Sequence, residues 1–135
     1  MPEAAKKRPE FRNIHVTQLA KYRLPIAGVV SILHRVSGTI MFLLLPFILY
    51  LLDNSLTSED TFNYFAGYTQ HLPVKFAILV LAWAYLHHFC AGIRHLLMDL
   101  HMGLDKHSAK KSGATVLAVS LTLAFLVALK LFGVF

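Results

Sequence analysis

The fold of this chain follows from the segment at residues 74–97, VKFAILVLAWAYLHHFCAGIRHLL. The segment is apolar over most of its length, and about 20 apolar residues in a helix cross the hydrocarbon core of a bilayer. Histidine and arginine side chains interrupt its second half. A histidine at bilayer depth is costly unless it binds a metal, a cofactor or a proton, so the segment predicts both a membrane-spanning helix and a site.

The composition places the whole chain among membrane proteins. Its 135 residues are 56% hydrophobic and only 15% charged, and the mean hydropathy of +0.58 is too high for a water-soluble domain of this length. Two more segments are long enough to cross a bilayer, so we expect helices over about 26–52, 74–97 and 114–132. The predicted fold class is an all-α membrane protein, with an N-terminal cytoplasmic arm at 1–25 and a three-helix membrane domain at 26–135.

The distribution of Lys and Arg predicts the orientation of these helices. None lies in the connection at 53–73, and three lysines follow the second helix. Six precede Pro25, namely Lys6, Lys7, Arg8, Arg12, Lys21 and Arg23. Because Lys and Arg accumulate on the cytoplasmic side, we expect the N-terminus inside and the C-terminus outside. The net charge of +6 then reflects topology and contact with lipid headgroups, and we expect no binding of nucleic acid.

The first eleven residues contain no apolar core and no small-residue cleavage site. We therefore expect neither a signal peptide nor a transit sequence, which favours a bacterial inner membrane, with the mitochondrial inner membrane as the alternative. The arm is expected to be irregular up to about Lys21. Phe62, Phe65 and Tyr68 recur every three residues, which favours a short helix over 58–68 whose role is packing in the connection.

Polar residues interrupt the first and second predicted helices at a similar depth. Arg35 lies roughly ten residues from the inner end of the first helix, and His88 lies about seven residues before His95 on the second. At 1.5 Å per residue both positions fall about 10–15 Å deep, in the inner half of the bilayer. We therefore expect the two interruptions to line one site.

Helical periodicity predicts which side chains share a face. At 100° per residue, Ser31 and Arg35 lie on one face of the first helix, with His34 and Gly38 beside them. On the second helix, one face carries His88, Gly92 and His95, and the neighbouring stripe carries His87, Ala91 and Arg94. Neutral imidazole is a good axial ligand for haem iron, whereas a quinone needs hydrogen-bond donors at its carbonyls. Ser37 and Gly38 are expected to allow close helix packing.

The residues alone leave several roles open. His87 and His88 are about 100° apart, and only the spacing to Gly92, a flat surface for a planar ligand, favours His88 as the iron ligand. The hydroxyl of Ser31 has an alternative partner in the carbonyl four residues earlier, and Arg35 has an alternative in lipid headgroups. The chain offers no second axial ligand at the right depth, so a partner subunit is expected to supply it.

Four stretches carry a resemblance to a known family. They are Arg8-Pro9, Arg23-Leu24-Pro25-Ile26, Ser31-x-x-His34-Arg35-x-Ser37-Gly38 and His88-x-x-x-Gly92-Ile93-Arg94-His95-Leu96-x-Met98-Asp99. They resemble the cytochrome b membrane anchor of succinate dehydrogenase in respiratory complex II, which is the larger-motif member of the anchor pair. The likeness covers most of the chain, although the arm is longer than usual and lacks the family's Ser-Pro-His-Leu stretch.

The resemblance implies a role for each candidate residue. His88 matches the axial ligand of haem b and is the metal ligand of the chain. His34, Arg35 and His95 match groups near the haem propionates, and Ser31 with Arg35 matches the lining of the ubiquinone pocket. No residue is implied to be catalytic, because this chain alone does not oxidise succinate.

The resemblance also implies the partners. These are the flavoprotein subunit, the iron–sulfur subunit and a second membrane-anchor subunit, with electrons passing from succinate through flavin and iron–sulfur clusters to quinone. The alternative from another class is a small membrane helix-bundle scaffold or a proton- or metal-handling protein, whose histidines titrate or bind Zn or Cu without haem.

Overall fold

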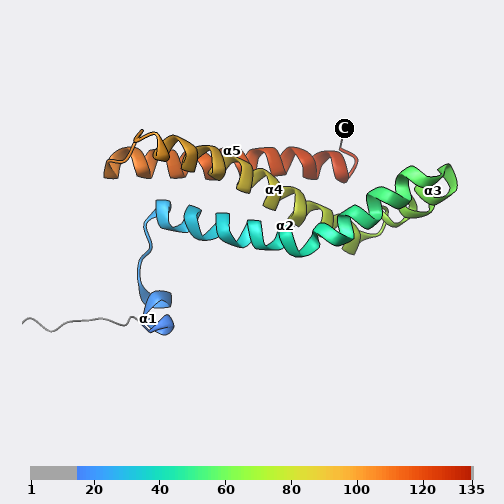
Figure 1. The fold of residues 1–135 in the computed structure, drawn as a ribbon, viewed down its shortest axis with the longest axis horizontal. Helices are drawn as coiled ribbons and strands as arrows, with labels where there is room; N and C mark the ends of the chain where they lie inside the picture. Colours follow the sequence, from blue (N-terminus) through green and yellow to red (C-terminus); the bar gives the residue numbers. More distant parts are fainter. Residues whose placement is uncertain (1–14, 135) are drawn as a thin grey trace, which may run out of the picture.

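The computed structural model describes residues 15–134, which form helices and short connections without a strand. The helices are α1 (Val16–Lys21), α2 (Ile26–Thr57), α3 (Glu59–Tyr68), α4 (Leu72–Asp99) and α5 (Lys106–Leu131) (Figure 1). The long helices α2, α4 and α5 each have the length and apolar composition needed to cross a membrane. The predicted class, all-α with three membrane-crossing helices, is confirmed.

The central helix of the bundle is α4, which contacts both α2 and α5, and α2 and α5 also touch each other. In Figure 1, α2 and α5 run in one direction and α4 runs in the other. The start of α2, the end of α4 and the start of α5 therefore share one end of the bundle. Arg23, just before α2, and Lys106, Lys110 and Lys111 of α5 all belong to that end.

The observed helices are longer than the predicted apolar segments. Most notably, α5 begins at Lys106 and not near residue 114. Asp105 caps it, since one carboxylate oxygen accepts from the backbone N–H groups of His107 and Ser108 at 3.0 and 2.9 Å. Hydrogen bonds from Ser108 hold the pKa of this carboxylate below its usual range. Hydropathy marks only the part of a helix that lies in hydrocarbon, whereas capping decides where the helix begins.

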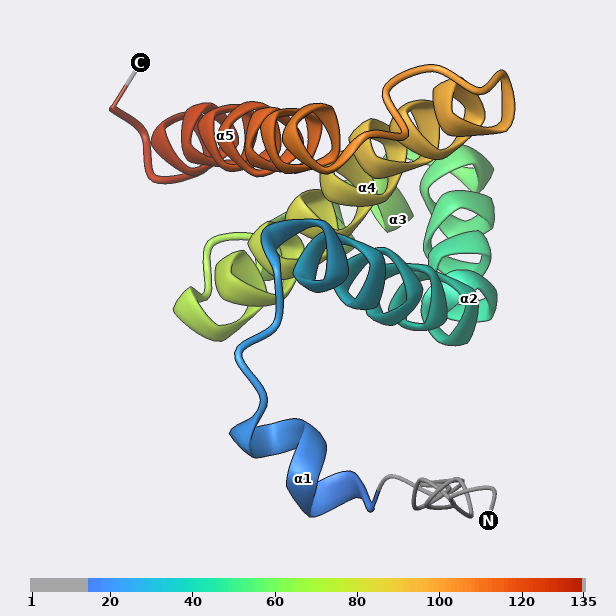
Figure 2. The same ribbon diagram turned by 90° about the vertical axis from the view of Figure 1, so that its left-hand side faces the viewer.

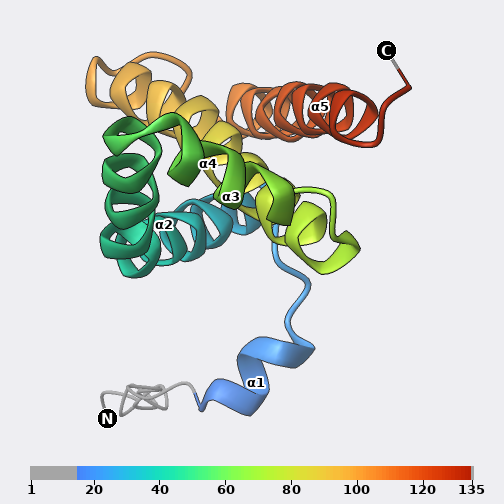
Figure 3. The ribbon, with the colours of Figure 1, turned by 90° about the vertical axis from the view of Figure 1, so that its right-hand side faces the viewer.

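Two expectations concerned the shorter elements. The prediction of an irregular arm up to Lys21 is wrong for Val16–Lys21, because these residues form the helix α1. Residues 1–14 of the predicted arm lie outside the described part of the chain. The short helix in the first connection is confirmed as α3, where Ser58 caps the helix by accepting from the backbone N–H of Thr61 at 3.2 Å. Figures 2 and 3 show α1 apart from the bundle and α3 beside the far end of α2.

A proline lies inside α2. Pro46 has no N–H to donate to the preceding turn, and its ring crowds the carbonyl four residues earlier, which bends a helix. Figures 2 and 3 show that α2 changes direction along its length, while the helix continues to Thr57. The first half of α2 therefore packs along α4, and the second half leads to α3.

Small residues form the interface between the long helices. The buried side of α4 carries Ala84 and Ala91, and that of α5 carries Gly113, Ser120 and Ala124. Large apolar side chains instead lie mostly on the outside, as expected where lipid or a partner subunit surrounds the helices. Lipid tails are as apolar as the helix surfaces, so the hydrophobic effect does not drive the helices together. Close approach of the backbones instead stabilises the bundle through van der Waals contacts.

Gly113 lies where α5 packs closely on the start of α2. A Cβ atom there would lie 3.2 Å from Cγ2 of Ile26 and 3.5 Å from the backbone of Ala27. We expect Gly113→Leu to lower the free energy of unfolding by about 1–3 kcal/mol, because the added side chain forces α5 away from α2. Thermal unfolding of the detergent-solubilised protein, followed by circular dichroism, measures this.

The matched control is Gly67→Leu in α3. A Cβ atom at Gly67 meets no other atom within 4 Å, so this exposed substitution is expected to change stability by no more than about 0.5 kcal/mol. Equal effects of the two substitutions would contradict the close packing of α5 on α2.

Candidate functional site

The ring of His88 is held against α2 by its Nδ1 atom. This atom lies 3.0 Å from the backbone carbonyl of His34 and 3.3 Å from Oγ of Ser37. The Ser37 hydroxyl donates its own hydrogen to the same carbonyl at 2.9 Å, so both neighbours of Nδ1 are acceptors. Nδ1 of His88 therefore carries the proton, and the lone pair of the neutral ring is on Nε2.

Gly38 makes room for this ring. A Cβ atom at Gly38 would lie 2.8 Å from Cε1 of His88, a distance that real Cβ atoms essentially never adopt. The sequence predicts that Ser37 and Gly38 allow close helix packing. In the structure both residues also lie directly against the ring of His88. Their spacing of three and four residues from His34 was the available signal, since it places them on the same side of α2.

Three imidazoles lie in a row between α2 and α4. His34 stacks on His88 with ring centroids 4.0 Å apart and planes inclined by 13°, and His95 lies 5.0 Å from His34 at 48°. Gly92 borders the row, since a Cβ atom there would lie 3.8 Å from Nε2 of His34. The common face of His88, Gly92 and His95 predicted from helical periodicity therefore lies against α2.

The row of imidazoles is a stack and not a chelating cage. Between residues 15 and 134, no group of three or more His, Cys, Asp and Glu side chains is placed to hold a metal ion. His34 covers a face of the His88 ring and does not oppose its Nε2 atom. Among the described residues, His34 is therefore not placed to share a metal ion with Nε2 of His88.

A second polar pair lies on α2. Nη2 of Arg35 donates to Oγ of Ser31 at 3.1 Å, which confirms that the two side chains share a face. Among the described residues, the Ser31 hydroxyl makes no bond to the carbonyl four residues earlier, so its hydrogen is available to another acceptor. Arg35 is exposed on this chain, and its guanidinium is thus available to a ligand or a partner.

His87 lies on the other side of α4. Its side chain is completely buried, its Nδ1 lies 3.3 Å from Oγ of Ser120 on α5, and its ring stacks on Trp83 with centroids 5.4 Å apart. Nε2 of His87 and Nε1 of Trp83 are buried without a hydrogen-bond partner among the described residues. The two adjacent histidines are therefore separated by the fold: His88 reaches the half-buried row, and His87 lies in the interior.

Comparison with known proteins finds relatives over most of the chain. The family model described as succinate dehydrogenase/fumarate reductase transmembrane subunit matches residues 6–127. The succinate dehydrogenase cytochrome b556 subunit of Coxiella burnetii is 36% identical over 103 residues, which cover 76% of this chain and 82% of that protein. The subunit of the same name in Paracoccus denitrificans is 35% identical over 109 residues, covering 80% and 83%.

A further relative extends the likeness over nearly the whole chain. The cytochrome b556 subunit of Rickettsia felis is 27% identical over 124 residues, which cover 92% of this chain and 93% of that protein. These bacterial relatives and the three apolar helices identify a multi-pass protein of the bacterial inner membrane. The chain belongs to the succinate dehydrogenase/fumarate reductase transmembrane subunit family, as a cytochrome b membrane anchor of the succinate dehydrogenase type.

Proposed function

We propose that this chain holds haem b through His88 and contributes Ser31 and Arg35 to the ubiquinone site of a succinate:quinone oxidoreductase. The observation that carries the proposal is the geometry of His88, whose Nδ1 is bound to the carbonyl of His34 while Nε2 keeps its lone pair. A hydrogen bond from the far nitrogen to a carbonyl is the usual support of a metal-bound histidine. The names of the relatives, which are cytochrome b556 subunits, support it further.

The residues around His88 fit a haem. Gly38 leaves the space that the imidazole needs, and the half-buried row opens to the surface of the chain, where a large planar group has access. Bound haem would supply a one-electron centre between the iron–sulfur subunit and quinone. The carbonyl of His34 and the hydroxyl of Ser37 fix the ring of His88 and keep its proton on Nδ1.

Three side chains are suited to the anionic propionates. His34 and His95 lie in the row with His88, and Arg35 follows His34 on α2. Imidazole and guanidinium groups donate charge-assisted hydrogen bonds to carboxylates, which are stronger than neutral ones. These residues orient the haem in the proposal, and none of them ligates the iron.

Ser31 and Arg35 are suited to a quinone carbonyl. The Ser31 oxygen accepts from Arg35, and a hydroxyl that accepts from a cation donates its own hydrogen more strongly. The pair therefore presents an O–H donor and further guanidinium N–H donors on one side of α2. Such donors bind the oxygen atoms of ubiquinone and stabilise the negative charge that develops on reduction.

The same proposal implies how the subunits of the complex are arranged around this chain. The basic end of the bundle, with Arg23 and with Lys106, Lys110 and Lys111 of α5, faces the cytoplasm, so the N-terminus is inside and the C-terminus outside. The flavoprotein and iron–sulfur subunits dock on that side and carry out succinate oxidation. A second membrane-anchor subunit would supply the other protein ligand of the haem, since His34 is stacked on the ring of His88 and is not placed to share a metal with its Nε2 atom.

The first prediction from this proposal separates the two adjacent histidines. We expect His88→Ala to remove the b-type Soret and alpha bands from the reduced complex, because the ligand is lost. His87→Ala is expected to keep them, because its ring points to Ser120 in the interior. The measurement is a reduced-minus-oxidised visible spectrum, normalised to assembled complex. If His87→Ala lost the bands and His88→Ala kept them, His87 would be the haem ligand. A wild-type complex without such bands would exclude the haem function.

The second prediction uses the space at Gly38. Gly38→Ala places a methyl group 2.8 Å from Cε1 of His88, so the imidazole must shift. We expect haem affinity to fall on the order of tenfold, which is typical when the support of a ligand is disturbed. Haem titration of the assembled complex measures it. Gly28→Ala is the control, since its Cβ meets Pro25 at an ordinary 3.6 Å, and an equal loss there would contradict a specific effect.

The third prediction concerns the quinone. We expect Ser31→Ala to lower kcat/KM for ubiquinone by about three- to tenfold and Arg35→Ala by about 10–100-fold, as for loss of a neutral and a charged hydrogen bond. Succinate oxidation by a soluble artificial acceptor should stay unchanged. Thr39→Ala, one turn further along α2, is the control. Equal loss of both activities would indicate failed assembly and contradict the assignment.

A further inference from the structure

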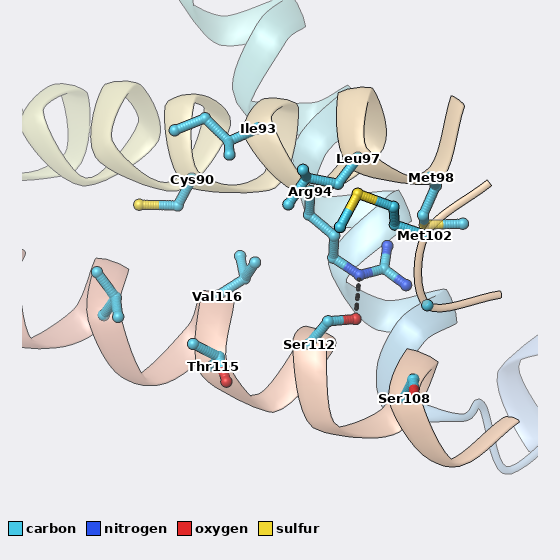
Figure 4. Close-up of a pocket in the computed structure, with 12 residues that line it drawn as sticks. Cys90, Ile93, Arg94, Leu97, Met98, Met102, Ser108, Ser112, Thr115 and Val116 are labelled. Carbon is cyan, nitrogen blue, oxygen red and sulfur yellow. Dashed lines mark hydrogen bonds between the residues drawn. The ribbon is translucent and has the colours of Figure 1, made fainter. Parts of the chain in front are cut away.

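A buried arginine lies on the side of α4 that faces α5, away from the row of histidines. Arg94 is only 6% exposed, and it lines a cavity of about 490 Å³ between α4, the connection that follows it and the first half of α5. Figure 4 shows the guanidinium directed across this cavity towards α5. The haem and quinone functions proposed above use no residue of this cavity.

The guanidinium has only one partner in the described part of the chain. Its Nε donates to Oγ of Ser112 at 2.9 Å (Figure 4). The Ser112 hydroxyl is in turn directed to the carbonyl of Ala109 at 3.3 Å. Neither Nη atom of Arg94 forms a hydrogen bond or an ion pair with any residue from 15 to 134. A buried cation without a counter-ion is costly, so this arrangement favours an anion in the cavity.

The lining of the cavity is polar at one end and apolar at the other. Hydroxyl groups of Ser108 and Ser112 lie on the α5 side near Arg94. The apolar remainder is lined by Ile93, Leu97, Met98, Met102, Val116 and Val119. Methionines adapt to flexible chains, and such a lining fits a ligand with an anionic head and a hydrocarbon tail.

The position of the cavity agrees with such a ligand. Arg94 is close to the C-terminal end of α4, and Ser108 is in the first turn of α5, so the polar part lies at the basic end of the bundle. Lys110 and Lys111 are exposed on α5 at the same end. Their charge raises the local concentration of anionic lipid at a membrane surface.

We propose that this cavity is a binding site for one anionic phospholipid. The phosphate accepts hydrogen bonds from both Nη atoms of Arg94 and from the Ser108 hydroxyl, while Ser112 holds Nε in place. One acyl chain lies along Val116 and Val119. A planar guanidinium suits the oxygen atoms of a phosphate better than a lysine does, because it offers two parallel N–H donors. The lipid would join α4 to α5 without touching the haem.

The experiment uses the whole complex, purified in mild detergent and stripped of lipid. Dioleoyl phosphatidylglycerol, dioleoyl phosphatidylcholine and inorganic phosphate are added separately, and bound lipid is counted by native mass spectrometry alongside the thermal midpoint of the complex. We expect phosphatidylglycerol to bind and to raise the midpoint more than the other two. If phosphatidylcholine bound and raised the midpoint equally, the net charge of the lipid would not matter and the proposal of an anionic lipid would be overturned. If inorganic phosphate raised the midpoint equally, the site would bind a free anion and the proposal of a lipid would be overturned.

Substitutions locate the lipid. Arg94→Gln is expected to weaken phosphatidylglycerol binding on the order of tenfold or more, as for loss of hydrogen bonds to a charged group. Arg94→Lys is expected to restore part of it. Lys110→Gln removes an exposed charge at the same end of the bundle and should change binding by less than about threefold. Unchanged binding in Arg94→Gln would overturn the proposal and indicate that a partner subunit neutralises Arg94.

A second pair of variants keeps the charge and tests the apolar part. Val119→Trp fills the groove beside the acyl chain and is expected to reduce phosphatidylglycerol binding while the complex still assembles. Val80→Trp is the control, since Val80 is equally a partly exposed valine of a long helix but lies outside the cavity. Equal binding by the two variants would overturn the assignment of this groove, even if Arg94→Gln fails to assemble.

Discussion

The structure depends on one constraint: a polar group in the hydrocarbon core of a membrane finds no water and must be paired within the protein or by a ligand. Helix α4 carries several such groups, and the bundle pairs them on two different sides. His88 bonds to the backbone of α2, whereas His87 and Arg94 bond to serines of α5. The position of α4 between the other two long helices follows from this division.

The two sides of α4 differ in what they leave unpaired. Towards α2, the bonds to Nδ1 of His88 leave a lone pair on Nε2, which suits a metal centre. Towards α5, the bond to Ser112 leaves the Nη atoms of Arg94 without an acceptor among the described residues, which suits an anion. Gly38 makes the arrangement at His88 possible, because a side chain there would displace the imidazole, and Gly113 allows α5 to pack closely on α2.

Much of this could be predicted from the sequence because hydropathy and helical periodicity are local properties. Three apolar segments determined three helices, and steps of 100° placed Ser31 on the face of Arg35 and placed His88 on a different stripe from His87. The start of α5 could not be read from hydropathy, because the cap at Asp105 lies outside the apolar segment. Likewise, α1 lies in a stretch without an apolar pattern.

The sequence by itself thus determined the class of the fold, the family and the set of polar residues that need a partner. Only the tertiary structure decided which partner each one has. Periodicity assigns a side chain to a stripe of its own helix, but the neighbour that the stripe meets depends on how the three helices pack. That packing separates His88 from His87, brings His34 into contact with His88 and leaves Arg94 facing a cavity.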